Sequence, residues 1–251
     1  MSIPCDIVGD RVLAAVYQNN AAQNCSDRYQ LFPTYNVIEV FRNMGYDVTR
    51  MQGLSRRSKA PEYGKHLLTF RREEDMDDKG AQEFVFINSH NGSCAAQLMH
   101  GYFRFACSNG CIFGEFSDRV GIRHTNPLET LMESIHVGIQ LQKEKAYTIH
   151  QMRNTYLSQA GKDDFVSASA LLRGVHDPRQ LLWVNRHEDM DSDLWTLYNR
   201  VQEALMRGKY DTYNAEKRQF RKARAITGVS ETLRINTNLW KIANNFLVQE
   251  G

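Results

Sequence analysis

The spacing of apolar residues changes about halfway along the chain. In the first half, several short stretches alternate at the period of two that a half-buried strand requires; His66, Leu68 and Phe70, for example, share one face of such a stretch. The strands predicted in this way cover residues 46–51, 65–72, 83–88, 102–107 and 112–116. A turn signal joins the last two strands, and basic residues surround the loop between the first two. The first half therefore predicts a mostly antiparallel sheet with a basic hairpin.

Apolar residues at helical spacing dominate the second half. The sequence Asn-Pro-Leu-Glu at 126–129 places Asn at the N-cap and Pro in the first turn, and it predicts a helix that runs to about residue 157. A second helix is predicted from Ser192 to a stop at Gly208, and a third is predicted after Asn236. The second half is therefore expected to be helical.

One further helix is predicted within the first half, at residues 34–43, with Thr34 as its N-cap. The fold class is therefore α+β, with a mostly β half at 1–125 and a helical half at 126–251. The chain has 251 residues, of which 42% are hydrophobic. This length and composition allow a substantial core, so we expect the two halves to form one integrated domain and exclude wholesale disorder.

The overall charge of the chain does not indicate a class of binding partner. Thirty-one Lys and Arg stand against 29 Asp and Glu, a net charge of +2, whereas a mimic of DNA would need a large acidic excess. No apolar run approaches the roughly 20 residues of a membrane helix. The opening residues do not have the charged-then-apolar pattern of an export signal. We therefore expect a cytoplasmic protein that does not contact membranes.

Metal and cofactor sites find little support in the sequence. Cys107 and Cys111 lie four residues apart, but no pair of Cys or His follows them at ligand spacing. Acids at 163–164 and 188–191 could bind Mg²⁺, yet they precede helical patterns, where acids favour the positive end of the helix dipole. Neither a Walker loop nor a Gly-x-Gly-x-x-Gly pattern occurs. We predict no metal and no cofactor.

The densest run of polar residues lies at 88–93 and has two interpretations. His90 could act as a base near pH 7 and Ser93 as a nucleophile. The run lacks the Gly-x-Ser-x-Gly elbow of α/β hydrolases, however, and its Asn-Gly pair is typical of a tight turn. His124 beside Arg123 could likewise hold a phosphate or only cap the sheet. We favour the turn, and keep His90, Ser93 and His124 as the alternative catalytic candidates.

Two clusters of basic residues contrast with the near-neutral total. Residues 50–72 hold seven Lys or Arg against one acid, and residues 207–224 hold seven against two. Phosphate contacts supply most non-specific nucleic-acid affinity, and interleaved aromatic residues can stack unpaired bases. The residues predicted to bind nucleic acid are Arg56, Arg57, Lys59, Lys65, Arg71, Arg72, Lys217, Arg218, Arg221 and Lys222. The alternative is that both clusters are solvated faces of a strand–loop–strand and of a helix.

An ordered series of motifs is similar to that of a known family. The motifs are Ser26-Asp27-Arg28-Tyr29-Gln30 with Pro33-Thr34, Gly64-Lys65-His66, residues 87–93, residues 103–110, Arg123-His124, residues 199–203 and Asn238-Leu239-Trp240. Together they resemble the domain-of-unknown-function family nine hundred and thirty-two, also labelled phage/plasmid-like protein. The resemblance implies a mobile-element protein made in a bacterial cytoplasm. It implies no reaction, because none has been assigned to the family.

The leading hypothesis is a non-enzymatic nucleic-acid-binding protein of a phage or plasmid. It would bind or anneal single-stranded DNA, as a ring or filament of identical chains, in recombination or replication. The expected order of helix, antiparallel strands, basic hairpin and helices also occurs in single-strand annealing proteins, an analogy of fold alone.

Two rival hypotheses stay open. One is a protein that inhibits a host defence enzyme through aromatic anchors, for which the candidates are Tyr102, Trp183, Trp195 and Trp240. Helical spacing favours a core position for Trp195 and Trp240 instead. The other is a nuclease or hydrolase that uses His90, Ser93 and His124.

Overall fold

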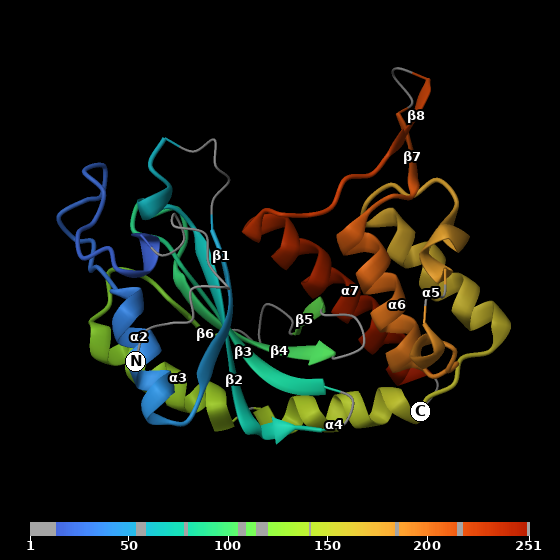
Figure 1. The fold of residues 1–251 in the computed structure, drawn as a ribbon, viewed down its shortest axis with the longest axis horizontal. Coiled ribbons are helices and arrows are strands. Elements are labelled where there is room, and N and C mark those ends of the chain that lie inside the picture. The colour runs from blue at the N-terminus through green and yellow to red at the C-terminus, as the bar shows by residue number, and fades with distance from the viewer. Residues whose placement is uncertain are drawn as a thin grey trace. The chain divides into compact units, whose positions relative to one another are not determined.

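A computed structural model describes residues 14–53, 59–77, 80–104, 109–113, 120–140, 142–183, 186–214 and 218–249 (Figure 1). It divides into two compact units, the first made of residues 1–103 and 116–142 and the second of residues 104–115 and 143–251. The chain therefore passes between the units more than once. The boundaries of the units differ from the predicted division at residue 125.

The first unit is built on an antiparallel sheet. The unit contributes to it the strands β1 (Asp47–Gln52), β2 (His66–Met76), β3 (Gly80–Asn88), β4 (Ala96–Arg104, of which the last residue is grouped with the second unit) and β6 (Val120–Ile122). β2 pairs with β1 and with β3, and β6 pairs with β4, all antiparallel. The predicted α+β class with a mostly antiparallel sheet is confirmed. β4 begins well before the predicted residue 102, and β6 was not predicted.

Two helices pack on this sheet. Helix α2 (Thr34–Asn43) has the predicted bounds, and α3 (Leu128–Gln140) follows the predicted Asn-Pro start. Phe41 of α2 stacks on Phe70 of β2 with ring centroids 4.1 Å apart, within one apolar core. The half-buried alternation predicted for β2 is wrong, because residues 66–70 are buried on both faces of the strand.

The second unit is mainly helical. It contains β5 (Asn109–Phe113), α4 (Gln142–Arg153, whose first residue is grouped with the first unit), α5 (Gln159–Leu171), α6 (Leu194–Arg207) and α7 (Val229–Gln249). Short 3₁₀ turns cover Pro178–Leu182 and His187–Asp189. α5, α6 and α7 contact one another, and Tyr198 of α6 meets the edge of the Trp240 ring of α7 at 5.8 Å. Among the described residues, no helix is long and apolar enough to cross a bilayer.

The helix ends differ in detail from the prediction. Asp193, not Ser192, caps α6, because its carboxylate accepts the Thr196 N–H at 2.9 Å. α7 begins at Val229, so Asn236 lies inside the helix rather than at its start. The turn predicted at 108–110 is also wrong for its last two residues, which begin β5. α5 was not predicted. Its acids at 163–164 were expected to precede a helix, but they lie inside α5.

A two-stranded hairpin interrupts the helices of the second unit. β7 (Asp211–Asn214) pairs antiparallel with β8 (Gln219–Lys222), and Figure 1 shows the hairpin projecting away from α5, α6 and α7. Gly208 ends α6 as predicted, with a φ of 73°. A Cβ at that position would lie 2.6 Å from the carbonyl oxygen of Ala223, so this turn requires glycine. The hairpin itself was not predicted.

Candidate functional site

Several motifs of the family resemblance converge in the first unit. Thr34, His66 and Asn88 are completely buried, and the Thr34 hydroxyl is hydrogen-bonded to both of the other side chains. The Nδ1 of His66 lies 2.9 Å from the Gly64 carbonyl oxygen and must therefore donate to it. His66 Nε2 then accepts from the Thr34 hydroxyl at 2.8 Å, and this hydroxyl accepts from the Asn88 amide at 3.0 Å. The Thr34 side chain thus bonds within this cluster, and Pro33 occupies the N-cap position predicted for it.

Two further histidines complete what we call the histidine cluster: His66, His90 and His124. His90 is completely buried and its Nε2 lies 2.8 Å from the Ala15 carbonyl oxygen. His124 Nδ1 lies 2.9 Å from the Gln30 carbonyl oxygen, and its ring stacks on Tyr29 at 4.5 Å. Neither His90 Nδ1 nor His124 Nε2 has a hydrogen-bond partner among the described residues.

Burial decides the protonation of the histidine cluster. It lowers the pKa of His66 to about 3 and also lowers the pKa of His90 and of His124 below the usual range. All three rings are therefore neutral near pH 7. His66 ties Thr34 to β2, His124 ties Gln30 to the residues after β6, and His90 holds Ala15, so each ring has a packing role.

Ser93 lies apart from the buried rings, on the surface of the turn at 88–93. Its side chain is exposed, and its backbone N–H donates to Asn91 Oδ1 at 3.1 Å. Gly92 has a φ of 70°, which suits a tight turn. The structure therefore separates an exposed serine from a completely buried His90, and catalysis by this pair stays a prediction without a geometric basis.

Two arginines of the first basic cluster, Arg71 and Arg72, are engaged in the fold. The Arg71 guanidinium donates to Glu83 Oε1 at 2.7 Å and lies 4.1 Å over the Phe103 ring. Arg72 donates to Asp75 Oδ1 at 2.9 Å and lies over the Tyr46 ring. Two other predicted ligands, Lys59 and Lys65, are exposed and half-buried respectively, and Arg56 and Arg57 lie outside the described residues.

The second basic cluster is presented on the β7–β8 hairpin. Arg218 and Arg221 are exposed and form no ion pair with another described residue, whereas Lys222 Nζ pairs with Asp211 at 3.0 Å. Lys217 lies outside the described residues. Phe220 beside them is 58% exposed, and its ring packs on Tyr213, which is 46% exposed. The hairpin thus combines accessible cations with accessible aromatic rings.

Backbone strain marks the start and the turn of this hairpin. Among the described residues, two that are not glycine have a positive φ, namely Lys209 at 75° and Arg218 at 47°. The left-handed region costs an ordinary residue roughly 1–2 kcal/mol. Lys209 lies just before β7 and Arg218 just before β8. Both strained positions therefore carry a cation where glycine would fit better.

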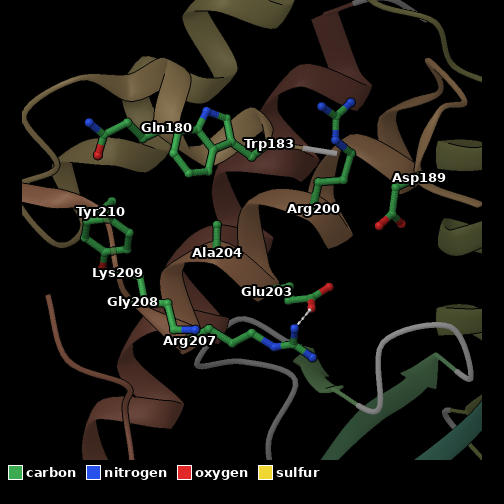
Figure 2. A pocket seen from close by; sticks show the side chains of 10 residues that line it. All are labelled: Gln180, Trp183, Asp189, Arg200, Glu203, Ala204, Arg207, Gly208, Lys209 and Tyr210. Carbon is green, nitrogen blue, oxygen red and sulfur yellow. Dashed lines mark ion pairs between the residues drawn. The ribbon is translucent and has the colours of Figure 1, made fainter. Parts of the chain in front are cut away.

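A pocket of about 300 Å³ lies at the base of the hairpin (Figure 2). Trp183, Arg200, Arg207, Lys209 and Tyr210 supply much of its wall. This pocket was not predicted from the sequence, because its residues come from separate elements: a 3₁₀ turn, α6 and the start of the hairpin. The positions 200, 203, 204 and 207, spaced as one helix face, were the available signal.

Two buried carboxylates in the wall of the pocket, Asp189 and Glu203, are held by arginines. Asp189 accepts from Arg104 and, at 3.1 Å, from Arg186. Glu203 accepts from Arg186 and, at 2.6 Å, from Arg207. Asp189, one of the acids considered for Mg²⁺, is therefore engaged in ion pairs. Among the described residues, no three His, Cys, Asp or Glu side chains are grouped closely enough to hold a metal.

The aromatic anchors proposed for a protein partner differ in exposure. Tyr102 is 3% exposed, and Trp195 and Trp240 are 4% and 0% exposed, as their helical spacing predicted. Trp183 is 73% exposed. Of the four candidates, Trp183 alone could anchor a partner.

The comparisons with known proteins identify the family. A family model described as "Domain of unknown function (DUF932)" matches residues 22–240. The chain belongs to the DUF932 family. It is similar to the UPF0380 protein YafZ of Escherichia coli K12, with 27% identity over 254 residues, and to the UPF0380 protein YfjQ of the same organism, with 27% identity over 250 residues. Each alignment covers 95% of this chain and 90% of the relative.

The predicted family resemblance is thus confirmed. The DUF932 match includes the histidine cluster, the β7–β8 hairpin and the pocket beside it. No solved structure matches the chain at a significant level.

Proposed function

We propose that this DUF932 protein is a non-enzymatic nucleic-acid-binding protein that binds single strands through the β7–β8 hairpin. The observation that carries the proposal is the pairing of accessible guanidinium groups with an accessible Phe220 ring on one projecting hairpin. Single-strand binders combine cations that follow the phosphates with aromatic rings that stack on the bases. Such stacking tolerates any sequence, because every base has a π face.

The strained backbone supports the same proposal. Glycine at position 209 or 218 would remove the cost of the left-handed conformation, yet the chain has Lys209 and Arg218 there. Residues held in sparsely populated backbone conformations cluster at functional sites. A requirement for positive charge at the start of the hairpin and in its turn accounts for both residues.

The first basic cluster would play a smaller part. Arg71 and Arg72 already have carboxylate and aromatic partners, so they would add little to phosphate binding. Lys59 and Lys65 would extend the basic surface of the first unit. The setting that we propose, a phage or plasmid in a bacterial cytoplasm, rests on the family resemblance. Annealing by a ring or filament of identical chains rests instead on the analogy of fold with single-strand annealing proteins.

The test measures binding of labelled single-stranded DNA, double-stranded DNA and single-stranded RNA across a salt series. We expect single strands to bind best, with a log–log slope of about 0.7 per phosphate contact. Arg218→Gly and Arg221→Ala should each weaken binding and reduce that slope, whereas Lys241→Ala, an exposed lysine of α7, should not. Oligomer size and the pairing rate of complementary strands in the same samples test annealing.

Binding that is absent at low salt, or that is unchanged in both hairpin variants, would overturn the proposal. Arg218→Gly is the sharper variant, because it removes a cation and relaxes the backbone at once. A loss of binding in this variant cannot be attributed to unfolding if its unfolding free energy is at least that of the wild type.

The exposed Trp183 supports a second candidate function, inhibition of a host defence enzyme by protein contact. Tryptophan is enriched among residues that dominate interface energetics. If this function is correct, a partner from host lysate should remain bound after nuclease treatment and should be lost in Trp183→Ala. Retention of that partner by Trp183→Ala would exclude Trp183 as the anchor.

A further inference from the structure

We propose that the pocket at the base of the hairpin binds a nucleotide, with the base on the Trp183 indole and the phosphate at Arg200 and Lys209. The nucleotide could be free or could be the end of a nucleic-acid strand. The inference deepens the proposed function, and it rests on that function only for the strand end.

The dimensions of the pocket suit such a ligand. Its volume of about 300 Å³ lies at the lower end of the roughly 300–1,000 Å³ common for small-molecule sites. In the view of Figure 2, Trp183 and Arg200 lie on one side of the pocket and Arg207 on the other. The pocket therefore offers an aromatic surface and guanidinium groups to one ligand, as a base and its phosphate require.

The charge around the pocket favours an anion. Three cations line the pocket, namely Arg200, Arg207 and Lys209, together with the carboxylates of Asp189 and Glu203. Arg104 and Arg186, which are not lining residues, also pair with these carboxylates. Each carboxylate is already paired with two guanidinium groups, so its repulsion of a phosphate is offset. An excess of positive charge remains for a ligand to neutralise.

Arg200 has bonding capacity that the protein does not use. One of its terminal nitrogens donates to the Leu182 carbonyl oxygen, but its buried Nε has no hydrogen-bond partner among the described residues. Leaving a buried donor without an acceptor costs free energy. Arg200 also lines the pocket, and guanidinium groups suit phosphate geometry.

The pocket is linked directly to the hairpin. Gln180 lines the pocket and holds the first residue of β7, because its Oε1 accepts the Asp211 N–H at 2.7 Å and its Nε2 donates to Asp211 Oδ2 at 3.1 Å. Lys209 belongs to the pocket wall and stands at the strained start of the hairpin. A strand that follows Arg221 and Phe220 could therefore place its terminal nucleotide in this pocket.

Intrinsic fluorescence reports on the site, because Trp195 and Trp240 are buried and Trp183 is exposed. The probes are deoxyadenosine 5′-monophosphate, deoxyadenosine and inorganic phosphate. We expect a saturable change with the monophosphate and a weaker response to the other two. Trp183→Phe should abolish the change. Absence of a saturable response to every probe in the folded wild-type protein would overturn the proposal.

Two variants test the phosphate contacts. Lys209→Gly relaxes the backbone, so the fold should be at least as stable, and it should weaken monophosphate binding about tenfold. Arg200→Gln should have an effect of similar size. Lys241→Ala is the control and should bind as the wild type does. Wild-type affinity in both Lys209→Gly and Arg200→Gln would contradict the proposed contacts.

Binding of two oligonucleotides that differ only in a 5′-phosphate distinguishes a strand end from a free nucleotide as the ligand. Tighter binding of the phosphorylated strand, lost in Lys209→Gly, would identify a strand end; equal binding of the two, together with monophosphate binding, would identify a free nucleotide. If the monophosphate binds and long strands do not, the proposal of a nucleotide site in the pocket is supported and the proposed function fails. If long strands bind through Arg218 and Arg221 while no mononucleotide binds, the pocket proposal fails alone.

Discussion

The two units differ in the exposure of the residues that could bind or catalyse. In the first unit, the histidine cluster is buried and neutral, and Arg71 and Arg72 are bound by carboxylates and aromatic rings. In the second unit, Arg218, Arg221 and Phe220 stand exposed on a projecting hairpin. The same residue types therefore stabilise one unit and are available for binding in the other.

The difference lies in which partners the fold supplies. The sequences 50–72 and 207–224 each hold seven basic residues, so charge density alone does not distinguish them. The partner of Arg71 is Glu83, twelve residues away on the neighbouring strand β3. The acids of the second cluster include Asp211, which pairs with Lys222 and leaves Arg221 of β8 and Arg218 of the turn accessible.

Removal of Arg71 should have the largest effect and should act on stability. Glu83 is 3% exposed at its side chain, and Arg71→Ala would leave that carboxylate buried without its cation. Breaking a buried pair in this way costs roughly 3–5 kcal/mol. Urea unfolding should show this loss, while the folded fraction should bind DNA as the wild type does.

A double variant tests the cause of that loss. Arg71→Ala with Glu83→Gln removes the uncompensated charge and should recover part of the lost stability. If Arg71→Ala instead keeps wild-type stability and weakens DNA binding, the first basic cluster is a binding surface and the contrast between the units fails.

Acid should destabilise the first unit through its histidines. His66 has an ordinary pKa of 6.5 in the unfolded chain and a pKa of about 3 in the folded one. Above pH 6.5 the ring is neutral in both states; below it, the unfolded chain gains a proton that the folded protein does not accept. The unfolding free energy should therefore fall as the pH decreases, by up to about 1.4 kcal/mol per pH unit for His66, and further for His90 and His124.

Unfolding by urea between about pH 7 and pH 5 measures this slope, because most carboxylates remain ionised there. His66→Gln should lower stability at neutral pH and flatten the slope. A slope unchanged by His66→Gln would show that His66 is not held neutral by burial.

Much of the fold could be predicted from the sequence. The elements that were missed were missed for identifiable physical reasons. The bounds of α2 and the Gly208 stop were predicted because local periodicity and glycine geometry determine them. The β7–β8 hairpin was missed because its four-residue strands are too short for a period to show, and its turn has Arg218 in the left-handed conformation instead of glycine.

The candidate site was predicted only in part, for a similar reason. Arg218, Arg221 and Lys222 were predicted as ligands from local charge density, and the structure places them on one strand and its turn. Arg71 and Arg72 looked equivalent in sequence, because their partners in space are not their neighbours in the chain. The pocket could not be predicted, since its wall joins Trp183, Arg200 and Lys209 from separate elements.

Phe220→Ala should weaken single-strand binding with little effect on stability. Stacking of one base on an aromatic ring contributes about 1–3 kcal/mol to binding. The ring is 58% exposed and contacts His176 and Tyr213, so its removal should cost the fold little. Tyr147→Ala, an aromatic residue of α4 that is 63% exposed, is the matched control and should leave binding unchanged. Equal losses in the two variants would mean that exposed aromatic rings act without regard to the hairpin.

The smallest effect, and the one that separates charge from structure, is expected from Arg218→Gly. Because Arg218 has a φ of 47°, glycine should raise the unfolding free energy by up to about 1 kcal/mol. The same change should weaken DNA binding and lower its salt slope by about one phosphate contact, because a cation is lost. Stability and binding would then move in opposite directions, which a damaged hairpin cannot produce. If both fall together, Arg218 holds the turn by its side chain, and the strained backbone no longer supports a role in nucleic-acid binding.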